Sequence, residues 1–210
     1  MNAHWHAERQ RRDVVLREDD TTRLTLPLDQ GGRYRIIAPD TAVVHDIVNA
    51  VERLAVTSVL PAQGGLLGAK TVAANFALAL HYGSDARDDL IAEWEDALHV
   101  ALRLAGLSEE RITRIGRELP MNLPRNERWL LGFVRCLLRP PELLVLDRIF
   151  SGLTRREAEA LAVLELLYHD YHPFRPVLFV DLDTHELPAV TDCRQEIRLT
   201  EYSREVACLS

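Results

Sequence analysis

Three features of this sequence have residue types and spacings that could do chemistry. Asp147 directly follows the apolar run Leu143–Leu146, so its carboxylate lies at the end of a predicted buried strand, where it either binds a cation or caps a turn. Lys70 is the only lysine of the chain, so any chemistry that requires a lysine has this single candidate. The segment His169–His172 contains metal-ligand residue types, but two histidines at a helix end more often complement the helix dipole or face water.

The composition predicts a globular protein and excludes several classes. The chain has 210 residues, of which 47% are hydrophobic and 27% are charged, which is enough to form a core. The sequence lacks a long uncharged apolar segment and a signal peptide, so we expect no membrane span and a cytoplasmic location. A net charge of -7 with scattered arginines makes nucleic acid a poor partner. Cys136, Cys193 and Cys208 are too widely spaced for a metal site or a disulfide framework.

Alternating strands and helices must position these side chains. Residues 1–13 are polar and are expected to form a flexible tail, with one domain over residues 14–210. A helix is expected to begin near Asp40 or Thr41, because apolar residues then recur at three- and four-residue spacing. The expected strands are Val14–Leu16, Thr22–Leu28, Arg33–Ala38, Val56–Leu60, Leu143–Leu146 and Val177–Val180.

The middle of the chain has the pattern of a helical lobe, from about residue 71 to residue 122. The expected helices are Thr71–His81, Asp85–Leu104 and Ser108–Leu119, followed by one that ends near Leu138 and one from about Arg155 to Tyr171. Buried apolar strands that alternate with helices indicate an α/β fold with a mainly parallel sheet covered on both faces.

The order of motifs between Leu123 and Leu153 resembles the ATPase subunits of ATP-binding cassette (ABC) transporters. The helix, the double proline Pro140-Pro141, the apolar strand, Asp147 and the string Phe150-Ser151-Gly152-Leu153 follow one another without a gap, as they do in the signature helix, Walker B strand and D-loop of that family. The resemblance extends from Leu24 to about Leu199. It implies a P-loop-NTPase-like sheet with a helical lobe. The antiparallel β subdomain that usually follows the first helix is reduced or absent, because only Ala55–Ala62 remains there.

The segment aligned with the Walker A loop departs from the family pattern. This degenerate segment contains Ala38, Pro39, Asp40, Thr41, Ala42, Val43, Val44, His45 and Asp46. It has no glycine to bring backbone N–H groups around phosphates, and Val44 stands about where the family has its lysine. Asp40 and Asp46 would repel a phosphate. The only aromatic residue before the first core strand that could stack on adenine is Trp5.

The remaining ATPase motifs are also altered. The signature position is occupied by Leu123, Pro124, Arg125, Asn126 and Glu127, and the D-loop position by Ser151, Gly152, Leu153 and Thr154. Asp147 matches the Walker B aspartate, which in the family holds the magnesium-bound water. The next residue in the family is the glutamate that polarises water, and in this chain it is Arg148. Because that glutamate is missing, we expect a structural role for Asp147. Leu182 occupies the switch-histidine position, unless the alignment is shifted to His185.

The resemblance also implies a partner. Gln63 matches the Q-loop, and Gln63, Leu66 and Leu67 are the expected docking surface for a membrane permease. Residues Asn75–Tyr82 resemble, more faintly, the ATPases of lipid-handling MCE-type transporters.

These departures predict a pseudo-ATPase, a structural or regulatory ABC transporter subunit with no catalytic residues, metal or resident cofactor. Weak Mg-ATP binding stays open. The expected partners are a homologous ABC ATPase subunit, a permease, or both. One alternative is an ATP-binding subunit that is active only with an intact homologue. The other is a free-standing protein-interaction scaffold.

Overall fold

The structure is a computed structural model with two compact units. It describes residues 4–81, 99, 102–103, 106–138, 141–151, 153–154, 158, 161, 165–166, 168–183 and 192–200. The first unit comprises Met1–Val59, Pro141–Gly152 and His169–Ser210, and the second comprises Leu60–Pro140 and Leu153–Tyr168. The second unit is thus larger than the lobe of residues 71–122 that the sequence indicates. Within the described residues, no helix is long and apolar enough to cross a membrane.

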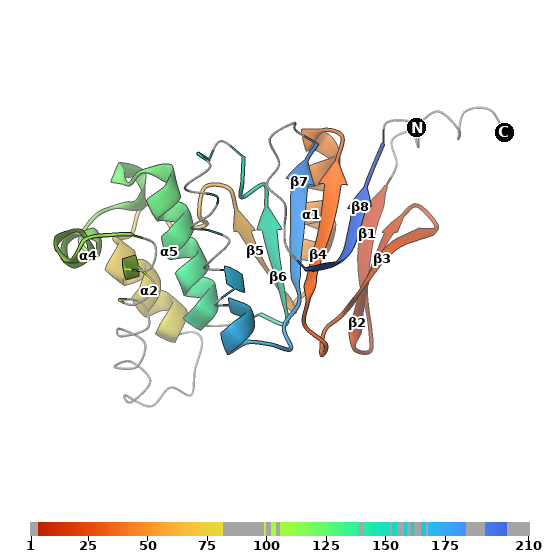
Figure 1. Cartoon of the computed structure of the whole chain (residues 1–210), viewed down its shortest axis with the longest axis horizontal. Coiled ribbons are helices and arrows are strands. Elements are labelled where there is room, and N and C mark those ends of the chain that lie inside the picture. The colour runs from red at the N-terminus through yellow and green to blue at the C-terminus, as the bar shows by residue number, and fades with distance from the viewer. Residues whose placement is uncertain are drawn as a thin grey trace. The chain divides into compact units, whose positions relative to one another are not determined.

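A five-stranded sheet forms the frame of the first unit, in the order β5-β6-β7-β4-β8 (Figure 1). Its strands are β4 (Arg33–Ala38), β5 (Thr57–Pro61), β6 (Leu143–Asp147), β7 (Val177–Leu182) and β8 (Cys193–Arg198). β7 pairs in parallel with both β6 and β4, and β4 pairs in parallel with β8. The strands of Val145 and Leu178 are direct neighbours, which confirms the predicted parallel sheet. The strand predicted at Val56–Leu60 is β5, which lies at the edge of the sheet.

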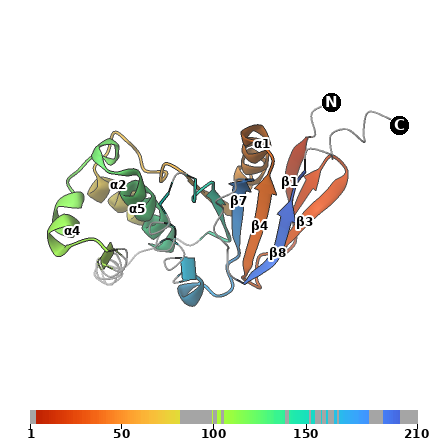
Figure 2. The same cartoon turned by 45° about the horizontal axis from the view of Figure 1, so that its top comes forward.

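Helix α1 (Thr41–Glu52) packs between this sheet and a second, antiparallel sheet. Its buried face includes Val44, Ile47 and Val51, which join one core cluster with Ile36 of β4 and Val180 of β7. Figure 2 shows α1 between β4 and β1, and β1 (Trp5–Gln10) contacts the helix. A helix with apolar residues on adjacent faces can bury both of them in such a position.

The antiparallel sheet has the order β1-β2-β3, and β2 (Asp13–Glu18) and β3 (Thr21–Pro27), which correspond to the strands predicted at Val14–Leu16 and Thr22–Leu28, form a hairpin. The flexible tail expected over residues 1–13 was wrong for Trp5–Gln10, which pair with β2 as strand β1. Trp5 is 4% exposed and Ala7 packs against the same core, whereas Arg9 and Gln10 at the end of the strand are exposed. Trp5 and Ala7 have the two-residue spacing of a strand, but the segment is mostly polar, so the sequence did not indicate the strand. Among the described residues, this sheet has three strands, all before α1, and only β5 lies between α1 and Gln63, which confirms the predicted reduction of the antiparallel subdomain.

The second unit is helical among its described residues. It contains α2 (Val72–His81), α4 (Glu109–Ile115), the short 3-10 helix η1 (Pro120–Asn122) and α5 (Arg125–Leu138). Trp129 and Phe133 of α5 stack with ring centroids 5.4 Å apart, and Phe133 contacts Tyr168. The helix predicted for residues 85–104 lies outside the described residues except at 99 and 102–103. The helix predicted over Ser108–Leu119 is α4, in which the Ser108 side chain is the N-cap and accepts from the Arg111 N–H, and it ends at Ile115 rather than Leu119.

Candidate functional site

The carboxyl edge of the parallel sheet holds most of the predicted site residues of the first unit. β4 ends at Ala38 and α1 begins at Thr41, so only Pro39 and Asp40 connect them. The backbone N–H of Val43 donates to Asp40 Oδ1 at 2.9 Å, which makes Asp40 the N-cap of the helix. A helix start of this kind otherwise offers free N–H groups to anions. Here a carboxylate of the chain itself takes one of these donors.

The other residues aligned with the Walker A loop lie within α1. Val43 and Val44 are buried in the core, so the residue at the family's lysine position faces away from solvent. Thr41, Ala42, His45 and Asp46 are exposed. The His45 ring lies within hydrogen-bonding distance of the Asn49 side chain, one helical turn further on. The segment thus has the geometry of an ordinary, side-chain-capped helix start.

Asp147 lies at the end of β6, where its carboxylate is 6% exposed. The next residue, Arg148, folds back onto it: Nε donates to Oδ1 at 2.6 Å and Nη2 donates to Oδ2 at 3.1 Å. This hydrogen-bonded pairing raises the pKa of the Arg148 guanidinium. Both carboxylate oxygens therefore accept hydrogen bonds from a fixed cation of the same chain.

A buried ion pair crosses β4 and β7, and sequence reasoning missed it. Arg35 Nε lies 2.9 Å from Asp181 Oδ2, and the two side chains are 3% and 2% exposed. The Arg35 guanidinium also lies over the Phe150 ring, 5.9 Å from its centroid. Burial raises the pKa of Asp181 to about 6, although Arg35 opposes the shift. The available signal was the presence of charged residues, Arg33 and Arg35 in β4 and Asp181 in β7, in strands that otherwise have the apolar pattern of a sheet interior.

The loop after β5 carries Gln63 and rests on α5 through backbone contacts within the second unit. Gly64 has φ of +92°, and a Cβ there would overlap the Arg128 carbonyl oxygen and lie 2.8 Å from the Trp129 nitrogen. Arg125 Nε donates to the Ala62 carbonyl oxygen at 3.2 Å. Gln63 itself is exposed. The loop is therefore fixed by its backbone and presents its side chains outward.

Asn75 of α2 clamps the far end of this loop. Its Oδ1 accepts from the Leu67 N–H at 2.7 Å, and its Nδ2 lies within 3.0–3.1 Å of the carbonyl oxygens of Leu67, Lys70 and Thr71. Asn75 is almost fully buried, whereas the Leu67 side chain is 54% exposed and Leu66 is partly exposed. Sequence reasoning quoted Asn75 as part of a pattern but did not identify this clamping role.

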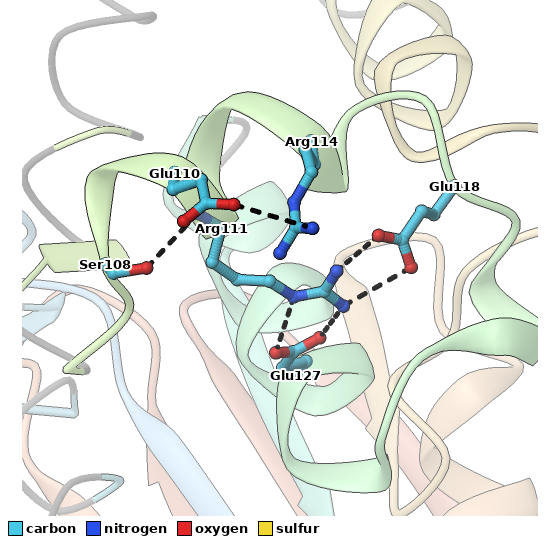
Figure 3. A network of polar contacts seen from close by, with 6 residues as sticks. All are labelled: Ser108, Glu110, Arg111, Arg114, Glu118 and Glu127. Carbon is cyan, nitrogen blue, oxygen red and sulfur yellow. Dashed lines mark hydrogen bonds and ion pairs between the residues drawn. The ribbon is translucent and has the colours of Figure 1, made fainter.

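The residues aligned with the signature motif begin α5 and are held by ion pairs (Figure 3). Arg111 of α4 donates to both carboxylate oxygens of Glu127 and also pairs with Glu118. These hydrogen bonds raise the pKa of Arg111. Leu123 is buried and Pro124, at the start of the helix, is exposed. The pairing fixes α4 against the first turn of α5.

The remaining predicted positions are dispersed or outside the described residues. Ser151 and Thr154 are exposed and Leu153 is half-buried, while Gly152 lies outside the described residues. Leu182 ends β7 and is half-buried, and His185 also lies outside them. No group of three or more metal-ligand side chains occurs within the part of the chain that the structure describes, which includes His169–His172.

Comparisons with known proteins connect this geometry to one fold. No family model and no curated protein matches the sequence. A solved dimeric structure of the ATP-binding cassette MJ0796, in a post-hydrolysis state bound to ADP and Pi, is 14% identical with a TM-score of 0.61, over 95% of this chain and 93% of that one. An ATP-binding subunit of an ABC transporter is 18% identical with a TM-score of 0.60, over 94% and 84% of the two chains. The chain has the fold of ABC transporter cassettes.

Proposed function

We propose that this chain is an ABC ATPase-like subunit that does not hydrolyse ATP and serves as a structural or regulatory component of an ABC transporter. The observation that carries the proposal is the start of α1. Its connection to β4 has two residues, no glycine and no lysine, and the Asp40 carboxylate accepts a helix N–H at 2.9 Å. A phosphate brought to this helix start would meet a negative charge at the donors it needs.

The residues of the sheet edge do not fit a magnesium-bound nucleotide. Both oxygens of Asp147 accept hydrogen bonds from Arg148, which also stands where a catalytic glutamate would follow Asp147. Trp5 is buried in the core, so it is not available to stack on adenine. The start of α1, the pairing of Asp147 with Arg148 and the burial of Trp5 together support loss of nucleotide chemistry with retention of the frame.

Retention of the frame points to assembly as the remaining role. Asn75 and the contact of Gly64 with α5 fix the backbone of the loop, while Gln63, Leu66 and Leu67 expose their side chains wholly or in part. A rigid loop with exposed leucines suits an apolar helix of a membrane permease. The protein would then lie at the cytoplasmic face of the membrane, beside a homologous cassette subunit. Residues 75–82, of which Tyr82 lies outside the described residues, resemble the ATPases of MCE-type transporters. The permeases of such transporters are therefore the first partners to test.

The purified chain is expected to show no Mg-ATP binding at micromolar concentrations by calorimetry. Loss of a phosphate-binding loop and its lysine removes several charge-assisted hydrogen bonds of about 1.5–3 kcal/mol each, which lowers affinity by orders of magnitude. A micromolar dissociation constant would contradict the proposal. ATP hydrolysis that disappears in the Asp147→Asn variant would contradict it more strongly, because it would place Asp147 in a working site.

The double variant Leu66→Asp/Leu67→Asp is expected to lose most of its co-purification with a permease from native membrane extracts. Asn75 holds the backbone at Leu67 rather than its side chain, so the variant should melt within a few degrees of the wild type. Phe174→Asp is the matched control, because Phe174 is also a large exposed apolar side chain, at 68% against 54% for Leu67, and belongs to the other unit. If the double variant keeps both its melting temperature and its partner, docking does not occur at this loop.

A further inference from the structure

We infer that Arg148 is a built-in counter-ion of Asp147 that closes the carboxyl edge of the sheet to divalent cations. The inference deepens the proposed function and rests on it, since it names the group that keeps this edge free of metal. It starts from the two bonds of 2.6 Å and 3.1 Å that join the guanidinium to both carboxylate oxygens. A cation that approached Asp147 would have to displace this guanidinium from both oxygens.

The backbone places Arg148 for this contact. Arg148 has φ of 48°, in the left-handed region that residues other than glycine rarely adopt. Its N–H donates to the Val180 carbonyl oxygen at 2.9 Å, and its own carbonyl oxygen accepts from the Ser151 N–H at 3.0 Å. Both backbone polar groups are thus used to hold the strained turn that directs the side chain back to the preceding residue.

The charge balance around β6 and β7 explains why a counter-ion is required here. Asp147 is nearly buried, and its negative charge adds to the effect of burial in raising the pKa of Asp181 on the neighbouring strand. Two carboxylates are therefore matched by two guanidinium groups, Arg148 on Asp147 and Arg35 on Asp181. Removal of Arg148 leaves an excess negative charge at the end of β6, which is the condition that attracts a divalent cation.

The test is thermal unfolding with millimolar MgCl2 against KCl of equal ionic strength, without nucleotide. The wild-type protein is expected to melt at the same temperature in both salts. Arg148→Ala is expected to melt roughly 3–6 °C lower in KCl, and MgCl2 should restore at least half of this loss. Asp147→Asn/Arg148→Ala should show no response to MgCl2, because the carboxylate is absent.

Arg198→Ala is the matched control. Arg198 pairs with Asp183, and both side chains are about half exposed, so water replaces the lost partner. This variant is expected to lose little stability and to ignore MgCl2. A magnesium response of the same size in Arg198→Ala would show a general effect of surface charge and would overturn the inference.

Two further results would also overturn the inference. One is an Arg148→Ala variant that melts as the wild type does and ignores MgCl2, and Arg148→Gln provides the same comparison if the alanine variant fails to fold. The other is direct Mn²⁺ binding by the wild-type protein that Asp147→Asn removes. Neither measurement contains nucleotide or permease, so either result is distinct from a failure of the Mg-ATP or docking tests.

Discussion

Gly132→Ala is expected to destabilise the second unit by about 3 kcal/mol or more, which is a decrease in melting temperature of roughly 6–12 °C. Gly132 lies inside α5, where alanine ordinarily stabilises a helix by about 1 kcal/mol relative to glycine. Here a Cβ would overlap the Gly64 carbonyl oxygen and lie 2.7 Å from its carbon and 2.8 Å from Leu60 Cδ1. The effect of packing therefore exceeds helix propensity and reverses its sign.

Gly68→Ala is the matched control for this experiment. Gly68 belongs to the same loop as Gly64, but a Cβ at Gly68 would meet nothing within 4 Å. The variant should therefore melt as the wild type does. Thermal or denaturant unfolding of the three proteins decides the question. Equal stability of Gly132→Ala and the wild type would mean that the loop does not rest on the backbone of α5, and the proposed docking surface would lose its physical basis.

Asp181→Ala is expected to lower the free energy of unfolding by about 3–5 kcal/mol at neutral pH, because it leaves the buried Arg35 guanidinium without its main partner. The remaining carboxylate near Arg35 is that of Glu196, at 3.7 Å on a partly exposed side chain. Replacement of both members, Arg35→Met/Asp181→Leu, is expected to change stability much less, since no unpaired charge stays buried. Chemical denaturation of the wild type, Arg35→Met, Asp181→Leu and the double variant measures the coupling energy of the pair.

The same pair predicts a pH dependence of stability. Burial raises the pKa of Asp181 from 3.8 to about 6, so the folded chain binds this proton more tightly than the unfolded chain does. The stability that this proton adds to the folded chain is fully present below about pH 4 and is lost as the pH rises through about 6. The difference in stability between the wild type and Asp181→Asn should therefore change over this interval. A constant difference from pH 4 to pH 7 would contradict the assignment.

Local patterns were sufficient for much of the frame and for the residue types at its strand ends. Apolar periodicity predicted the strand at Arg33–Ala38 with its observed bounds, a helix that begins near Asp40 or Thr41, and the buried strands that contain Val145 and Leu178. The lack of glycine and lysine before α1 and the identity of Arg148 are properties of the sequence alone. Such features can be predicted because each depends on residues only a few positions apart.

Tertiary structure decided which residues meet across long separations. No local signal paired Arg35 with Asp181 or brought Gly132 against Gly64, since each contact joins segments that approach only after the chain has folded. Strand β1 is polar in composition and is stabilised by pairing with β2 and by burial of Trp5. The sequence by itself determined that the connection between β4 and α1 contains neither glycine nor lysine. Only the fold determined that the Asp40 carboxylate caps α1 and that the Arg148 guanidinium pairs with Asp147 at the end of β6. The direction of a side chain depends on the backbone that holds it.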